Sequence, residues 1–202
     1  MLTLCQKSLR RVVANNIYLL LNFNLFYDRG VATLELNTDR LRVIPLNAGN
    51  LKLLIDSQRE LELKLLLNET TIFLDSEIKS AMKVRLTKLL DDEQNYIWYT
   101  NWLIVLKAEN YIVGGIMLKG RPNENGEVII GYYTNPNYQG NGYMTETIGQ
   151  MKSWLLRQPD VRYVIADTEK DNIASQRVLE KTGAKMYKET KDLFFWRFAQ
   201  SE

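Results

Sequence analysis

The chain has 202 residues, enough for one domain or for one domain with an appendage. Its apolar content of 46% is ordinary for a globular protein, and its net charge of only +2 does not suggest a nucleic-acid surface. The chain contains no histidine, which excludes histidine-dependent nucleophile systems and the common histidine-based zinc sites, so we expect no metal. Cys5 is the only cysteine, so no disulfide can form within the chain, and this favours a reducing cytoplasm.

Residues 1–32 differ in character from the rest of the chain. Several basic residues precede an apolar run from Ile17 to Phe26. This run is too short to cross a bilayer, and the absence of a convincing small-residue cleavage site after it disfavours a secretory signal. We interpret residues 1–32 as an appendage or an over-long assigned start with no assigned function. The domain itself is then predicted at residues 33–202.

Within this domain, strand-like and helical patterns alternate. Apolar residues at three- and four-residue spacing indicate helices, and short apolar runs between turn residues indicate strands. In chain order the patterns predict a strand at 41–44, a helix over 51–67, a helix that Asp75 caps and that reaches Leu89, a hairpin of strands at 102–107 and 111–118, a turn at 121–126, a strand at 128–134, a helix over 143–155, a strand at 163–166, a helix over 172–182, and strands near 185–189 and 193–198. An antiparallel start and a parallel middle imply an α/β fold with a mixed sheet and helices on both faces.

The stretch from Gly131 to Trp154 joins a predicted strand to a predicted helix through a turn that contains Gly140 and Gly142. The first amides of a helix have no internal partner and the helix dipole favours negative charge, so such a turn suits an anion. Because Thr145 replaces the third glycine of the dinucleotide fingerprint and no Gly-Lys-Ser/Thr follows, this is neither a Rossmann site nor a P-loop. We interpret it as a pyrophosphate cradle, with a plain strand-to-helix turn as the alternative.

Two sequence blocks resemble the GCN5-related N-acetyltransferase (GNAT) family. The first is YQGNGY at 138–143, preceded by Asn-Pro, which is similar to the family's acyl-CoA loop. The second is NIAS at 172–175, followed by VLEK at 178–181. Two blocks in this order are far more specific than either alone. The resemblance covers roughly Leu36 to Phe198 and is strongest to the RimJ/RimL-type branch, which acetylates the N-termini of ribosomal proteins and related amines.

The resemblance implies a mostly antiparallel central sheet in which a splayed parallel strand pair holds acyl-CoA. It also implies that the strand before the cradle pairs with the pantetheine arm and that the loop amides bind the diphosphate. The cofactor-binding residues implied in this way are Tyr132, Tyr133, Thr134, Gln139, Gly140, Asn141, Gly142, Tyr143 and Asn172. The family often has arginine where Gln139 stands, so here backbone dipoles must supply more of the anion binding. Arg177, Lys181 and Lys152 are candidates for the outer phosphate, although a solvated helix face is the simpler explanation for each of them.

The second block supplies two candidate catalytic residues. Asn172 matches the family asparagine that bonds the cofactor arm or an active-site water, and it also suits a helix N-cap. Ser175 matches a position that protonates the leaving thiolate in some relatives. Many relatives instead place a tyrosine acid four residues further on, where this chain has Leu179. Ser175 is therefore the preferred acid, with Tyr133 and Tyr187 behind it.

The general base is predicted by position. In the resembling branch a glutamate commonly precedes the Ile-Gly-Tyr sequence, and here that position is Ile129. Glu127 lies two residues earlier on the same strand face and is predicted to act through water. The alternatives are Asp167, placed at the end of the next strand, and catalysis by positioning alone.

The sequence as a whole predicts a cytoplasmic N-acetyltransferase, monomeric or homodimeric, with acetyl-CoA as co-substrate. By the resemblance, it transfers the acetyl group by direct attack of a primary amine, such as a protein N-terminus. The low net charge and the short apolar run predict no nucleic-acid or membrane partner. One alternative is the same reaction on a free small amine such as a polyamine, an amino acid or an aminoglycoside. The other is a non-catalytic acyl-CoA-binding module.

Overall fold

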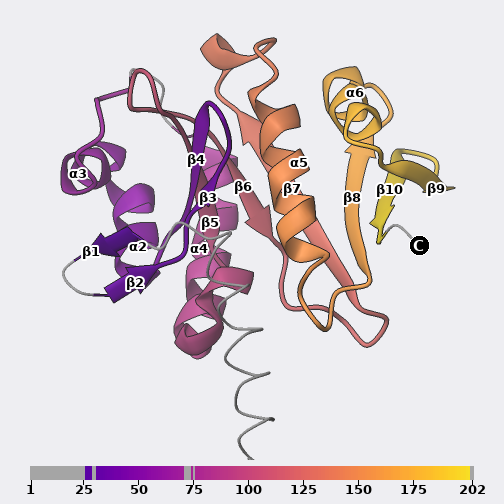
Figure 1. The fold of residues 1–202 in the computed structure, drawn as a ribbon, viewed down its shortest axis with the longest axis horizontal. Helices are drawn as coiled ribbons and strands as arrows, with labels where there is room; N and C mark the ends of the chain where they lie inside the picture. The colour runs from indigo at the N-terminus through magenta and orange to yellow at the C-terminus, as the bar shows by residue number, and fades with distance from the viewer. Residues whose placement is uncertain (1–25, 29–30, 71–73, 75, 201–202) are drawn as a thin grey trace, which may run out of the picture.

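The computed structural model describes residues 26–28, 31–70, 74 and 76–200 (Figure 1). Their strands are β1 (Phe26–Asp28), β2 (Val31–Thr33), β3 (Leu36–Asn37), β4 (Leu41–Pro45), β5 (Asn101–Leu106), β6 (Tyr111–Leu118), β7 (Glu127–Thr134), β8 (Tyr163–Glu169), β9 (Lys185–Glu189) and β10 (Leu193–Ala199). Their helices are α2 (Ala48–Asp56), α3 (Gln58–Lys64), α4 (Ser76–Asp91), α5 (Tyr143–Leu155) and α6 (Ile173–Lys181), with 3-10 helices η1 (Glu93–Trp98) and η2 (Pro136–Tyr138).

Eight of these strands form one mixed sheet in the order β3-β4-β5-β6-β7-β8-β10-β9, and β1 and β2 form a separate antiparallel pair. Every neighbouring pair of the described large sheet is antiparallel except β7 and β8, which run parallel. The predicted mixed, mostly antiparallel sheet is therefore confirmed.

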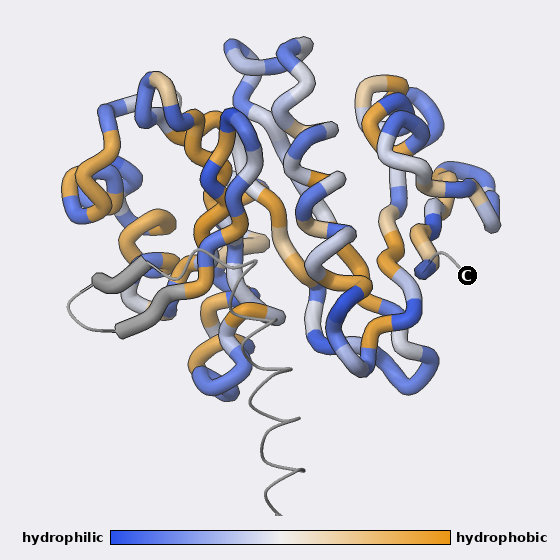
Figure 2. Tube along the Cα trace, viewed as in Figure 1, coloured by the Kyte–Doolittle hydropathy of each residue, from blue (hydrophilic) through white to orange (hydrophobic). Residues whose placement is uncertain are grey.

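Helices cover both faces of the sheet, as predicted, because alternate strand residues point to opposite sides. On one face α2, α3 and α4 pack against Leu103, Val105 and Ile112. On the other face α5 and α6 pack against Val128, Ile130 and neighbouring strand residues. Figure 2 shows apolar residues running along the central strands between these two layers. No helix in the described part of the chain is long and apolar enough to cross a membrane.

The β7–β8 pair separates partway along its length. Its parallel register begins at Glu127 with Tyr163 and ends at Ile129 with Ile165. The rest of β7 continues to pair with β6, as far as Thr134 opposite Gly114. One backbone edge of the second half of β7 is therefore not used by β8, which agrees with the predicted splayed pair.

Two predicted elements differ from the observed ones by three or more residues at a boundary. The single helix predicted over 51–67 is two helices, because Ser57 adopts an extended conformation (φ −154°, ψ 99°) and its hydroxyl accepts from the Glu60 amide to start α3. The strand predicted to end at 166 extends to Glu169, so Asp167 lies inside β8 and not at its end. The predicted cap Asp75 and residues 1–25 lie outside the described residues, and the division at 32/33 stays a prediction.

Candidate active site

A cavity of about 510 Å³ lies between the last residues of β7, the start of α5 and one side of α6. It contains all but one of the predicted cofactor residues, together with the candidate acid Ser175. Asn141 is the exception, although its neighbours on both sides line the cavity. The residues that line it are Tyr132, Tyr133, Thr134, Tyr138, Gln139, Gly140, Gly142, Tyr143, Met144, Thr145, Asn172, Ala174, Ser175, Arg177, Val178 and Lys181.

The loop before α5 depends on two left-handed glycines. Gly140 has φ 78° and Gly142 has φ 76°, a region that side chains with a Cβ rarely adopt. Gly142 is the N-cap of α5 and provides no side-chain cap. A Cβ at Gly140 would meet no other atom within 4 Å, so the requirement for glycine there is conformational and not a matter of space.

The amides that follow these glycines are free. The first backbone hydrogen bond of α5 joins the Glu146 amide to the Gly142 carbonyl at 3.1 Å. In the described part of the chain, the amides of residues 140–145 have no backbone acceptor, whereas the Gln139 amide donates to the Pro136 carbonyl at 3.2 Å. The free amides therefore begin one residue later than predicted, and they make the helix start a seat for an anion.

Polar side chains brace this loop from within. The Asn135 amide group donates to the Ile112 carbonyl at 3.0 Å and ties the start of the loop to β6. Gln139 Nε2 donates to the Thr134 carbonyl at 3.3 Å, and Asn141 Nδ2 donates to the Gln139 carbonyl at 3.1 Å. The Gln139 side chain thus closes the loop on itself, which agrees with anion binding by the backbone. The Asn-Pro pair at 135–136 indicates a turn from the sequence alone. The sequence does not indicate that Asn135 bonds to β6.

Of the three cations considered for an outer phosphate, two line the cavity. Arg177 and Lys181 both belong to α6 and contribute to its wall. Lys152 instead donates to the Thr182 carbonyl and lies 5.2 Å from the centroid of the Phe198 ring. Lys152 therefore ties α5 to the end of α6 and does not line the cavity.

The second block forms the opposite wall of the cavity. Asn172 is the N-cap of α6, and its Oδ1 accepts from the Ser175 amide at 3.0 Å. The Tyr132 hydroxyl donates to the Ser175 carbonyl at 3.2 Å and so joins β7 to α6. Burial raises the pKa of Tyr132 to about 12, against a smaller opposing effect of its hydrogen bond to Ser175. Leu179 is fully buried in the core, so this position supplies no acid.

Tyr133 contributes differently from its neighbour. Its ring packs over β6, where a Cβ on Gly115 would come within 2.7 Å of Tyr133 Cε1. Burial raises the pKa of Tyr133 well above its usual value. Trp102 of β5 belongs to the core, since its ring is fully buried and its centroid lies 5.2 Å from that of Trp154.

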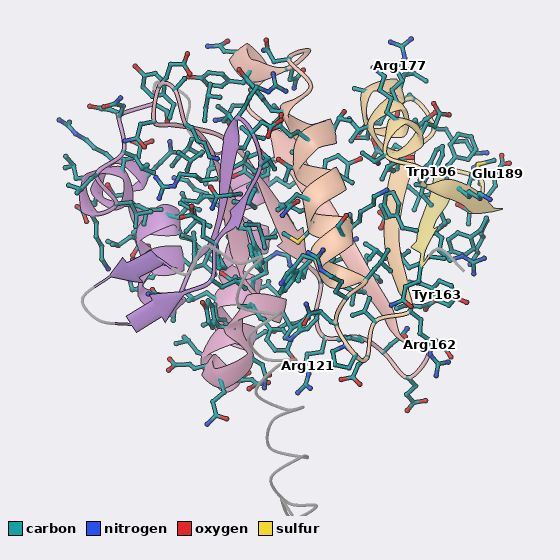
Figure 3. All side chains as sticks on the ribbon, in the orientation of Figure 1. Arg121, Arg162, Tyr163, Arg177, Glu189 and Trp196 are labelled. Carbon is teal, nitrogen blue, oxygen red and sulfur yellow. The ribbon has the colours of Figure 1, made fainter. Side chains whose placement is uncertain are left out.

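The predicted base is not brought into the cavity. Glu127 starts β7 opposite Tyr163, and its carboxylate accepts from Asn123 Nδ2 at 2.9 Å. Tyr132 is five residues further along, or about 16 Å at the rise of a strand. Figure 3 shows Tyr163 at the opposite end of the molecule from Arg177 of α6.

The alternative base, Asp167, accepts a hydrogen bond from Lys119 Nζ at 2.9 Å. This contact lies on the same face of the sheet as Ile129, which is 39% exposed. No Asp or Glu is among the residues that line the cavity. Within the described residues, no group of three or more Cys, Asp or Glu side chains could hold a metal ion.

The separated strands and the unpaired helix start together define an α/β protein with an anion-binding loop beside an open strand edge. The family model of the acetyltransferase (GNAT) domain matches residues 66–185. This chain therefore belongs to the GNAT acetyltransferase family.

Similar proteins agree with this assignment. The uncharacterized N-acetyltransferase YjdG of Bacillus subtilis (strain 168) is 39% identical over 85 residues, which are 42% of this chain and 51% of YjdG. The match thus spans about half the length of that relative.

Two solved structures share the fold. The ribosomal-protein-S5-alanine acetyltransferase of Vibrio fischeri has a TM-score of 0.61 at 16% identity, covering 82% of this chain and 96% of that one. RimL, a ribosomal L7/L12 alpha-N-protein acetyltransferase in complex with coenzyme A, has a TM-score of 0.60 at 15% identity, covering 82% and 97%. At these identities the likeness is one of fold.

Proposed function

We propose that the protein is an acyltransferase that moves the acetyl group of acetyl-CoA to a primary amine, with a protein N-terminus as the acceptor. The observation that carries this proposal is the run of unpaired amides at residues 140–145, all but one of which belong to residues that line the cavity beside the free edge of β7. A diphosphate fits such a helix start, and an extended pantetheine arm fits an unpaired strand edge. Family membership and the coenzyme A complex of RimL support the same co-substrate.

The loop amides would hold the diphosphate, and the backbone of Tyr132 to Thr134 would hold the arm. Acetyl-CoA supplies an activated acyl group. In the transfer, the amine nitrogen forms a bond to the thioester carbonyl carbon, the carbon–sulfur bond breaks, the amine loses a proton and the thiolate gains one. Holding the two reactants together contributes much of the acceleration in such reactions.

Three side chains are assigned roles in the transfer. Ser175 would donate to the leaving sulfur, and Asn172 would orient the arm or a water. A thiol with a pKa of about 8.5 is a good leaving group, so Ser175 needs only to donate a hydrogen bond. Glu127 lies outside the cavity, so it would accept the amine proton only through a chain of water molecules, and an α-amine with a pKa of about 8 needs no stronger base. Asp167 is the alternative in that role.

The choice of a protein N-terminus draws on the names of the fold relatives, which are acetyltransferases of ribosomal proteins S5 and L7/L12. The second candidate function is an acyl-CoA-binding module without catalysis. It is favoured by one observation, the absence of any carboxylate among the residues that line the cavity.

Thiol release from acetyl-CoA tests these functions together. The acceptors to compare are peptides with free N-termini, the same peptides with blocked N-termini, polyamines, amino acids and aminoglycosides. We expect release with the free N-terminal peptides and none with their blocked partners. Turnover confined to small amines would contradict the peptide acceptor. Tight coenzyme A binding without turnover on any acceptor would favour the binding module.

A further inference from the structure

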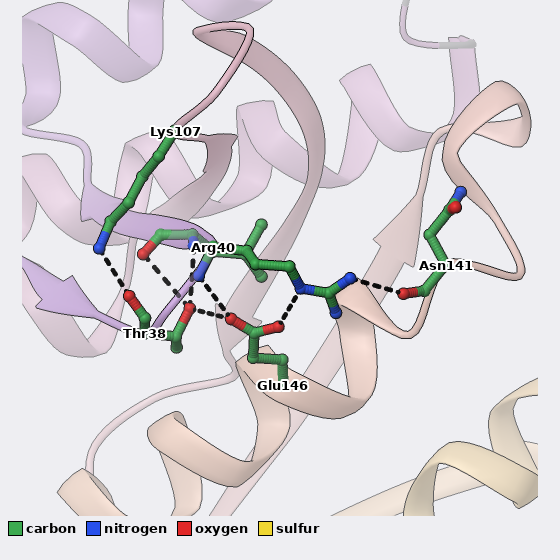
Figure 4. Close-up of polar contacts among 6 residues, drawn as sticks. Thr38, Arg40, Lys107, Asn141 and Glu146 are labelled. Carbon is green, nitrogen blue, oxygen red and sulfur yellow. Dashed lines mark hydrogen bonds and ion pairs between the residues drawn. The ribbon is translucent and has the colours of Figure 1, made fainter.

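The turn between β3 and β4 brings a cation to the loop that precedes α5. Arg40 lies in this turn, and its Nε donates to Glu146 Oε2 at 2.7 Å (Figure 4). Its backbone amide donates to Glu146 Oε1 at 3.0 Å. The two residues are 106 positions apart, so this contact joins the start of the sheet to the first turn of α5.

Glu146 is held in its ionised form by this arrangement. Burial alone would raise the pKa of the Glu146 carboxyl, but hydrogen bonds from Thr38 and Arg40 and the Arg40 charge outweigh it and lower the pKa. Thr38 is itself fixed, because Lys107 Nζ donates to its carbonyl at 2.6 Å. A carboxylate in the first turn of α5 is therefore charged at neutral pH and lies close to the free amides of the loop.

The remaining face of the Arg40 guanidinium contacts the loop itself. Its Nη1 donates to the Asn141 carbonyl at 3.1 Å, and its central carbon lies 4.7 Å from the centroid of the Tyr143 ring. A Cβ built on Gly142 would lie 3.7 Å from Arg40 Nη2. The guanidinium thus contacts the loop on both sides of Gly142 while it holds Glu146.

We propose that Arg40 is a positioning residue for the diphosphate of coenzyme A, an inference that rests on the proposed function. Arg40 holds the Asn141 carbonyl in place, which keeps the amides of Gly142 and Tyr143, two residues that line the cavity, available to the diphosphate. It also neutralises Glu146, whose unpaired charge would repel a phosphate at the start of α5. The loop side chains of Gln139 and Asn141 carry no charge. Arg40, which belongs to the β3–β4 turn, brings a cation into contact with this loop.

A role in binding is separable from a role in folding. The Arg40 side chain is 47% exposed, and ion pairs at such exposed positions contribute little to stability. Removing Arg40 should therefore change the melting temperature little. Its effect should appear instead with ligands that carry a diphosphate.

Calorimetric affinities for coenzyme A, dephospho-coenzyme A and pantetheine test this inference. We expect Arg40→Ala to weaken both diphosphate ligands by about tenfold and to leave pantetheine unchanged. Arg40→Lys keeps the charge but cannot bond Glu146 and Asn141 together, so its affinity should be intermediate. The double variant Arg40→Ala/Glu146→Gln should bind coenzyme A more tightly than Arg40→Ala, because the unpaired carboxylate is gone.

Arg59→Ala is the matched control, because Arg59 pairs with Glu69 on the exposed surface of α3 at 3.7 Å and should leave all three affinities unchanged. Unchanged coenzyme A affinity in Arg40→Ala, with normal binding by the wild type, would overturn the role of Arg40 alone. An equal loss of pantetheine binding would also overturn it, since that would indicate a general distortion. Failure of the wild type to bind coenzyme A would overturn the proposed function as well. Should Arg40→Ala not fold, the contrast between the ligands can be read from Arg40→Lys.

Discussion

The two ends of β7 present different kinds of chemistry. At its C-terminal end, Thr134 leads into a loop whose free amides and glycine geometry form the proposed cofactor site. At its N-terminal end, Glu127 is paired with Tyr163 across a continuous ladder, and Asn123 holds its carboxylate. The C-terminal end of β7 thus presents unpaired backbone amides, and the N-terminal end presents side chains where β7 and β8 are hydrogen-bonded.

Under the proposed function, this difference assigns cofactor binding to one end of β7 and deprotonation of the amine to the other. Backbone amides bind an anion wherever the loop has the right conformation, so changes at that end should affect affinity. Side chains at the other end should affect the rate and its pH dependence without altering affinity. The predictions below test this separation.

The largest effect is expected from Gly142→Val at the cofactor end. A β-branched residue at a φ of 76° is strained by about 1 to 3 kcal/mol, so the loop should shift and coenzyme A affinity should fall by about tenfold to a hundredfold. Calorimetry measures this loss, and circular dichroism should show that the protein remains folded. Gly149→Ala, inside α5 where a Cβ meets nothing within 4 Å, is the control and should bind normally. Unchanged affinity in Gly142→Val would contradict the assignment of the loop.

Glu127→Gln tests the other end of the strand. Because Glu127 would act through water, acetyl transfer at neutral pH should slow by about tenfold, less than the hundredfold or more typical of a base in direct contact. Coenzyme A affinity should be preserved. Steady-state kinetics on a free N-terminal peptide measure the rate. Full activity here, together with a slower Asp167→Asn variant, would transfer the role to Asp167, and full activity in both would favour positioning alone.

Asn172→Ala sharpens the comparison by separating capping from binding. Loss of the cap of α6 should lower the unfolding free energy by about 1 kcal/mol, and loss of the amide from the cavity wall should also weaken coenzyme A binding. Asn47→Ala removes an equivalent cap, since Asn47 Oδ1 accepts from the Asn50 amide of α2 at 2.9 Å. Asn47→Ala should lower stability alone. Equal coenzyme A affinities in the two variants would mean that Asn172 acts only as a helix cap and does not bind the cofactor.

The last prediction concerns Tyr132 at high pH. Its pKa is about 12 in the folded protein because of burial, above the usual value of 10.0, so the neutral form is favoured by folding. The stability that this group contributes is present below pH 10 and is lost as the pH rises toward about 12. Urea unfolding across this range should therefore show a smaller decline for Tyr132→Phe than for the wild type. Identical declines would show that Tyr132 titrates in the folded protein as in the unfolded chain.

The sequence predicts some parts of the candidate site and not others. The loop before α5 could be proposed as the cofactor loop because its glycines, the preceding strand and the following helix are close together in the chain. The contact between Arg40 and Glu146 was not predicted, because nothing near Arg40 in the sequence indicates it. The length of β8 was also underestimated, since Thr168 continues the strand through its antiparallel pairing with Phe194 of β10.

The sequence by itself determined the order of the elements, the conformation of the loop and the two helix starts that face the cavity. These features arise from neighbouring residues, whose spacing and backbone freedom decide local structure. Tertiary structure alone decided where β7 and β8 separate, which carboxylates stay away from the cavity and which arginine supports the loop. Those outcomes depend on strand register and on how the β3–β4 turn lies against α5, and only the packing of the whole sheet brings such distant residues together.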